Sequence, residues 1–292
     1  MESSPLFSIG LPVSLFIIMV GIGLTLTVRD FGQVTLNPKG MIVGTIAQIL
    51  LMPMAAFAIA SMLSLTPALA VGLVVIAACP GGATSNLFTL LSRGNVALSI
   101  LLTVSASLIA ILSLPFFTNL ALVQYFGESA EITLPVGKTI TMLAVIVLLP
   151  VATGMLIRSR WPERAQRMEN GVSRFGAAVL LLLSILLLWE SRDRLVQLFL
   201  DAGPATLLLN LAGIIVGLGF SRVLGLSRWE SMAVAVELGI KNGTLAFMVT
   251  LTLLESSEMS VPVMVYSLLM YMVGFLLVVA GQKLIPASSP AT

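Results

Sequence analysis

An otherwise apolar region of the chain is interrupted by the sequence Glu237-Leu238-Gly239-Ile240-Lys241-Asn242-Gly243. Two charged side chains, Glu237 and Lys241, stand here four residues apart, inside an apolar stretch of membrane-spanning length at residues 227–255. A charge at the bilayer centre costs at least about 2.5–3.5 kcal/mol, so such residues mark functional sites by default. An ion pair within one helix would fit their spacing. Two apolar residues would cost less, so stability alone does not explain the pair.

The composition of the 292-residue chain is that of an integral membrane protein. Hydrophobic residues make up 58% and charged residues 10%, with a mean hydropathy of +1.08. A soluble domain has about 45–50% apolar and about 25% charged residues. Water-soluble enzymes, nucleic-acid binders and disordered scaffolds are therefore excluded. The chain has no histidine and one cysteine, Cys79, which excludes histidine-based catalysis, the usual zinc sites and an internal disulfide.

Nine apolar stretches are long enough to cross a bilayer, which takes about 20 residues. We predict an all-α membrane protein with nine transmembrane helices, at residues 6–28, 41–63, 66–92, 95–123, 134–157, 171–190, 203–225, 227–255 and 260–283. Eleven Lys and Arg residues, with Arg29 and Arg174 among them, fall in one alternating set of loops and helix ends, and three, with Arg194 among them, fall in the other. The positive-inside rule then places the C-terminus in the cytoplasm and the N-terminus outside, with Glu128 and Glu131 in an outside loop.

A second interruption, Pro80-Gly81-Gly82-Ala83-Thr84-Ser85-Asn86, lies in the helix at 66–92. Broken helices in corresponding positions of two halves are the best sequence pointer to the site of a transporter. We therefore predict inverted repeats of four and five helices, at residues 6–123 and 134–283. Simple proline–glycine kinks would explain the glycines but not the polar residues at the same depth.

The polar residues of the interruptions suit charged ligands. Where the chain restarts as a helix near Thr84, free N–H groups and the positive end of the helix dipole suit an anion. Carbonyl groups and the oxygens of Ser, Asn and Glu suit a small hard cation. We expect the substrate cavity to be lined by Ala83, Thr84, Asn242, Gly243 and Thr244.

Three motifs resemble those of the bile acid:sodium symporter family: Cys79 to Asn86 followed by Ser92 to Ser99, then Glu237-x-Gly239-x-x-Asn242, and Gln48-x-x-x-Met52-Pro53. The resemblance covers nearly the whole chain and is to the nine-span version of the family. It implies one transporter unit over residues 1–292 with two crossing broken helices. The core domain would comprise the helices of residues 41–123 and 203–283. The panel domain would comprise the helices at 6–28, 134–157 and 171–190.

The same resemblance implies two sodium sites. The first would use Ser85, Asn86, Ser99, Thr103 and Glu237, all of which carry oxygen. The second would use Gln48, Glu237, carbonyl groups near Leu238 and Ile240, and a glutamine at the position where Lys241 stands here.

Lys241 departs from the family pattern in a way that changes the expected chemistry. A protonated lysine only donates hydrogen bonds and cannot ligate sodium. We predict that its ammonium replaces the second sodium ion, paired with Glu237 and hydrogen-bonded to Gln48. Transport would then couple to one sodium ion. In the alternatives, the lysine exchanges its proton during the cycle and transport is proton-coupled, or transport is independent of cations.

We predict a secondary active symporter of a small organic anion, working by alternating access in the bacterial inner membrane as a monomer. The family substrates include bile acids, steroid sulfates, pantoate and pyruvate, and nothing in the chain selects one of them. The expected cofactor is the sodium ion, without an organic cofactor or nucleic-acid partner. An intramembrane enzyme is disfavoured, since Glu237 is the one acid that lies away from the ends of the predicted spans. A channel fits inverted repeats less well, and an anion-sensing receptor without transport stays open.

Overall fold

The computed structural model describes residues 10–27, 38–127, 136–190, 192 and 195–286. Within these ranges the secondary structure is helical, apart from one antiparallel bridge between Gly81 and Lys241. The prediction of an all-α protein is thus confirmed for the described residues. Four charged residues used for the predicted orientation lie outside them: Arg29, Glu128, Glu131 and Arg194.

Among the described residues, five helices are long and apolar enough to cross a membrane. They are Pro38–Met62 (α3 Pro38–Ile46, η2 Ala47–Leu51 and α4 Met52–Met62), α7 Val96–Phe126, α8 Val136–Arg160, Val196–Val223 (within α10 Leu195–Ile214, η4 Ile215–Phe220 and α11 Ser221–Val223) and α14 Ser260–Leu284. Four shorter apolar helices are α1 Leu11–Leu24, α5 Pro67–Ala78, Arg174–Trp189 within α9 Pro162–Glu190, and Gly243–Leu253 (α13 Gly243–Phe247 and η5 Met248–Leu253). These nine segments overlap the nine predicted ranges, and the number of crossings stays a prediction.

Two of the predicted helices are broken, each near the expected place. The first consists of α5 and α6 (Ser85–Leu91), joined by residues 79–84. Its break begins where Cys79, which precedes a proline, adopts an extended conformation, as the ring of Pro80 favours. The second consists of α12 (Arg228–Gly239) and α13, and its break begins at the extended residue Ile240. Residues 79–84 and 240–242 are called the crossing below.

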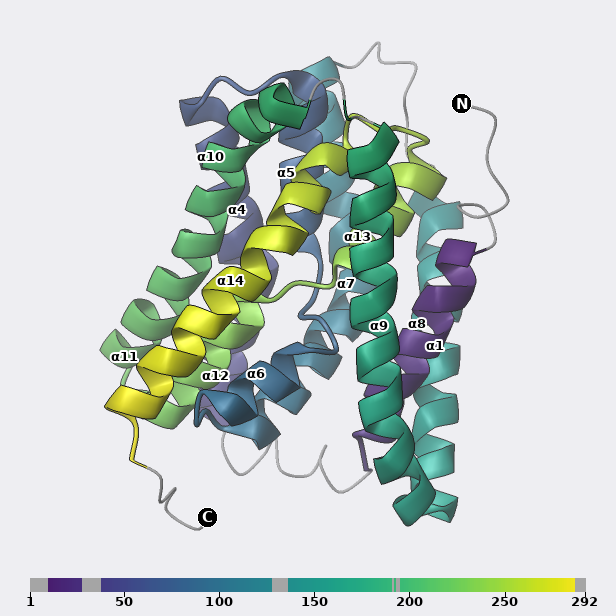
Figure 1. Ribbon diagram of the computed structural model, residues 1–292, viewed down its shortest axis with the longest axis vertical. Helices are drawn as coiled ribbons and strands as arrows, with labels where there is room; N and C mark the ends of the chain where they lie inside the picture. Colours follow the sequence, from purple (N-terminus) through teal and green to yellow (C-terminus); the bar gives the residue numbers. More distant parts are fainter. Residues whose placement is uncertain (1–9, 28–37, 128–135, 191, 193–194, 287–292) are drawn as a thin grey trace.

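The helices form two groups that Figure 1 shows side by side. Helix α1 packs against α8 and α9, at the right of the view. Gly23 of α1 and Gly154 of α8 meet at this contact, where a Cβ on either would overlap backbone of the other helix. The broken helices pack with α4, α7, α10 and α14. The three helices of the first group overlap the ranges predicted as the panel, although α9 begins at Pro162, before the predicted residue 171. Movement between the groups stays a prediction.

Three π-helical segments, η2, η4 and η5, interrupt the helices of the second group. Each adds one residue to a turn, and such segments are frequent at functional sites. The first of them contains Gln48, a residue expected to bind an ion. Hydrophobic periodicity gave no indication of these segments.

Candidate functional site

The two broken helices are joined at the crossing by backbone hydrogen bonds. The N–H of Gly82 donates to the carbonyl of Ile240 at 2.9 Å, and the N–H of Asn242 donates to the carbonyl of Pro80 at 2.8 Å. A Cβ at Gly81 would overlap the carboxylate of Glu237, and one at Gly82 would lie 2.9 Å from the carbonyl oxygen of Lys241. Glycine is therefore required for the two segments to approach this closely.

Oxygen atoms gather around the Glu237 carboxylate, behind the crossing. Thr103 donates a hydrogen bond to Oε1 of Glu237 at 2.6 Å, and Ser99 lies 3.3 Å from Oε2. The same Ser99 hydroxyl lies 3.1 Å from Oδ1 of Asn86, and Ser85 lies 3.5 Å from Thr103. Glu237, Ser85, Ser99 and Thr103 are fully buried. The structure thus brings together the residues expected for the first sodium site, which we call the oxygen cluster: Ser85, Asn86, Ser99, Thr103 and Glu237.

The oxygen cluster has the chemistry of a site for a small hard cation. A buried carboxylate is costly unless a cation or several donors compensate it. Hydroxyl, amide and carboxylate oxygens are the ligands that hard cations prefer. Thr89 joins the cluster by donating to Ser99 at 3.1 Å. Sequence reasoning missed Thr89, although it stands four residues after Ser85 on α6 and so shares its face.

The contacts of Lys241 differ from those expected. Its ammonium is buried and donates to the carbonyl of Cys79 at 3.1 Å. Within the described part of the chain it forms no ion pair with Glu237, and both amide atoms of Gln48 are buried without a hydrogen-bond partner. The reason is that α12 ends at Gly239, so the spacing of four residues no longer places the two charges on one helical face.

The carbonyl groups expected at the second sodium site already have donors. Ile240 accepts from Gly82 at the crossing. The hydroxyl of the buried Tyr266 lies 2.9 Å from the carbonyl of Gly239 and 3.4 Å from that of Leu238. These hydrogen bonds hold the end of α12 in place, and they leave the carbonyl oxygens less available to a cation.

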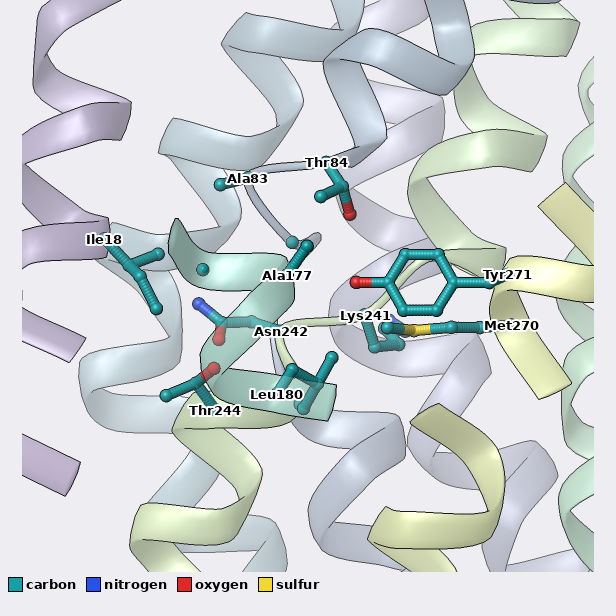
Figure 2. A pocket seen from close by; sticks show the side chains of 13 residues that line it. Ile18, Ala83, Thr84, Ala177, Leu180, Lys241, Asn242, Thr244, Met270 and Tyr271 are labelled. Carbon is teal, nitrogen blue, oxygen red and sulfur yellow. The ribbon is translucent and has the colours of Figure 1, made fainter. Parts of the chain in front are cut away.

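A small pocket of about 20 Å³ lies at the front of the crossing (Figure 2). All five residues expected at the substrate cavity line it: Ala83, Thr84, Asn242, Gly243 and Thr244. Oδ1 of Asn242 caps α13 by accepting from the N–H of Leu245 at 3.0 Å, whereas its Nδ2 has no hydrogen-bond partner in the described residues. Asn242 therefore offers a free donor toward a ligand.

A larger cavity of about 350 Å³ lies between the two helix groups. Ala83, Thr84 and Ala177 line both this cavity and the pocket at the crossing. The larger cavity extends between α1 and α9 on one side and α6 and α7 on the other. It has the volume of a site for a small organic molecule.

Two further polar residues near the crossing were missed by sequence reasoning. Tyr271 of α14 lines the small pocket, and Figure 2 shows its hydroxyl group directed into it. Asn210 of α10 is fully buried, and its amide atoms have no hydrogen-bond partner among the described residues. Its Oδ1 lies 3.8 Å from the place of a Cβ at Gly239. A lone amide within an apolar run was the available signal for Asn210.

Two broken helices that cross beside a buried carboxylate and a small pocket define the class of ion-linked membrane transporters. Comparison with known proteins agrees with this class. The model of the Sodium Bile acid symporter family matches residues 12–198. The chain belongs to this family, which is one of sodium-coupled transporters and not of enzymes. The second broken helix, with Glu237 and Lys241, lies outside the matched residues.

Three relatives illustrate the range of the family. The "probable sodium/metabolite cotransporter BASS2, chloroplastic" of Oryza sativa subsp. japonica is 33% identical over 83% of this chain and 56% of its own length. The "uncharacterized sodium-dependent transporter YocS" of Bacillus subtilis is 29% identical over 80% of this chain and 71% of its own. The ileal sodium/bile acid cotransporter of Homo sapiens is 27% identical over 82% of this chain and 68% of its own length. The chain spans a little over half the length of the chloroplast relatives.

Proposed function

We propose that the protein is a sodium-coupled symporter of a small organic anion that works by alternating access. The observation that carries this proposal is the oxygen cluster, in which buried side-chain oxygens converge on the Glu237 carboxylate. A bound sodium ion would compensate that charge. The family and its relatives, named as sodium/metabolite and bile acid cotransporters, support sodium as the coupling ion.

Lys241 takes the place of the second sodium ion in this proposal. Its buried ammonium lies at the crossing, on the chain segment that follows Glu237. The backbone carbonyls expected at a second sodium site are already used by Gly82 and Tyr266. A tethered positive charge at this position would repel a second cation, so one sodium ion would accompany each substrate.

The helices α1, α8 and α9 would act as the panel, and the remaining helices as the core. Cavities that share residues of the crossing and of α9 support a substrate path between the two groups. Movement of one group against the other would expose the crossing to either side in turn. The proposal includes the nine crossings, an inner-membrane location and the C-terminus in the cytoplasm.

The melting temperature of the purified protein against sodium tests the proposal without knowledge of the substrate. Potassium holds the ionic strength constant, and binding to the folded state raises stability by mass action. We expect a sodium-specific rise that disappears in Glu237→Gln, whose amide keeps the size of the carboxylate but not its charge. Equal curves for sodium and potassium in the unmodified protein would contradict sodium coupling.

Proton coupling is a second candidate, favoured by one observation. The ammonium of Lys241 hydrogen-bonds a neutral carbonyl, so its proton could leave without breaking an ion pair. In proteoliposomes, a pH gradient would then drive uptake of an organic acid with no sodium present. Dependence of uptake on sodium at equal pH on both sides would exclude this candidate. Anion binding without any flux would instead indicate a receptor.

A further inference from the structure

Arg174 carries the one charge among the residues that line the larger cavity. The other lining residues are apolar or neutral, with Thr25, Thr84 and Asn86 as the polar members. The sequence places Arg174 with the basic residues of the loops, whereas the structure places it on the cavity wall. Its side chain is exposed, and within the described ranges it has no hydrogen bond or ion pair.

The position of Arg174 relates it directly to the crossing. Ala177, three residues further along α9, lines both the larger cavity and the pocket at the crossing. Three residues of helix rise about 4.5 Å. The backbone of Arg174 therefore lies within one helical turn of Ala177, which also lines the pocket that holds Asn242, so an elongated small molecule could extend from Arg174 toward the crossing.

The chemistry of the cavity selects the sign of its ligand. A single positive charge in a cleft with apolar walls concentrates anions, because low-dielectric walls focus its field. A guanidinium offers two parallel N–H donors that match a carboxylate or a sulfonate. The neutral donors near the crossing, on Asn242 and Thr84, suit the hydroxyl or carbonyl groups of the same molecule.

We propose that Arg174 binds the carboxylate or sulfonate of the transported organic acid in the larger cavity. The proposal deepens the proposed function and rests on it. Arg174 would set the preference for an anion, while the crossing would recognise neutral polar groups. The substrate class is then an organic acid with one anionic group and with hydrogen-bonding groups at its other end.

The charge of the cavity can be measured with a cysteine reporter. Leu87 lines the cavity and is 49% exposed, whereas the native Cys79 is fully buried, so Leu87→Cys gives one accessible thiol. We would compare its reaction rates with a sulfonate-bearing and a trimethylammonium-bearing methanethiosulfonate, in detergent. Adding Arg174→Gln should lower the ratio of the sulfonate rate to the trimethylammonium rate roughly fivefold, which is what Coulomb's law gives for unit charges about 8 Å apart in water. Adding Arg174→Lys, which retains the charge, should preserve it.

Ser159→Cys is the matched control, on the exposed end of α8 and outside the cavity lining. A ratio at Leu87→Cys that Arg174→Gln leaves unchanged, or an equal change at Ser159→Cys, would overturn the proposal. Pyruvate should lower the rate ratio in Leu87→Cys with Arg174 intact, and it should not do so when Arg174→Gln is added. The uncharged methyl pyruvate should have no effect in either protein. A ratio insensitive to pyruvate would overturn the carboxylate assignment.

Added phosphatidylglycerol distinguishes a lipid headgroup from a free organic acid. The lipid is added at concentrations that leave the ratio at the Ser159→Cys control unchanged. If it then removes the effect of Arg174 on the rate ratio at Leu87→Cys, Arg174 binds lipid and the proposal fails. The readout is independent of the ion site. A sodium-dependent melting shift together with an unchanged ratio would therefore reject the role of Arg174 and leave the proposed function intact.

Discussion

The hydroxyl of Thr103 lies 2.6 Å from Oε1 of Glu237, although the two residues are 134 positions apart in the chain. Helix α7 of the first half thus holds the carboxylate of a broken helix from the second. Both side chains are fully buried. The short contact fixes the orientation of the carboxylate within the oxygen cluster, whose oxygens would together hold a cation.

Replacement of Thr103 by valine should weaken the sodium response. Hydrogen bonds to charged groups contribute about 1.5–3 kcal/mol, so we expect the sodium concentration for half-maximal melting shift to rise about tenfold or more. Thr118→Val is the matched control, because Thr118 is buried on the same helix without a hydrogen-bond partner in the described residues. An equal loss of response in both variants would assign the effect to general packing of α7.

Replacement of Lys241 by glutamine should create a second sodium site. The variant removes a positive charge and adds an amide oxygen at the crossing, so the dependence of the melting temperature on sodium should become steeper than for one ion. Lys241→Met removes the charge without adding an oxygen and should keep the single-ion slope. An unchanged Hill slope in Lys241→Gln would show that the lysine does not stand in for a cation.

Replacement of Gly81 by alanine should disturb both the crossing and the ion site. The added methyl group would overlap the Glu237 carboxylate, and overpacking in a buried site costs about 1–3 kcal/mol. We expect a lower melting temperature and no specific response to sodium. Gly203→Ala is the control, since a Cβ there meets nothing within 4 Å. A sodium response that survives in Gly81→Ala would place the ion elsewhere.

Replacement of Asn242 by aspartate should separate folding from substrate binding. Aspartate retains the oxygen that caps α13, so stability and the sodium response should persist. Its second oxygen replaces the free Nδ2 donor with a negative charge, which should reduce uptake of any accepted organic acid at least about tenfold. Asn95→Asp makes the same change at the cap of α7 and should transport normally. Normal uptake by Asn242→Asp would remove Asn242 from the site.

The sequence was sufficient to predict the two breaks and the oxygen cluster. Pro80 and the glycines mark the breaks through local backbone chemistry. Ser99 and Thr103 are four residues apart, so a regular helix must place them on one face. The breaks and the shared face of Ser99 and Thr103 depend on short-range geometry within one segment. The full oxygen cluster joins α6, α7 and α12, and its members were predicted from the family resemblance.

The partners of Lys241 and the place of Arg174 could not be predicted in the same way. A spacing of four residues implies a shared face only while the helix continues, and α12 ends before Lys241. The distribution of basic residues over the loops places Arg174 near a membrane surface. Which residues surround it depends on how α9 faces α6 and α7 across the larger cavity. Tertiary packing also determines the π-helical turns, for which hydrophobic periodicity carries no signal.

The two hydrogen bonds at the crossing join main-chain atoms, from Gly82 to Ile240 and from Asn242 to Pro80. No side chain takes part in them, so substitution at positions 84, 241 or 242 leaves this junction in place. If these positions bind the ion and the substrate as proposed, a lineage could change its coupling ion or its cargo by point mutation without rebuilding the architecture. Lys241, where the family resemblance implies a glutamine, would be one product of that freedom.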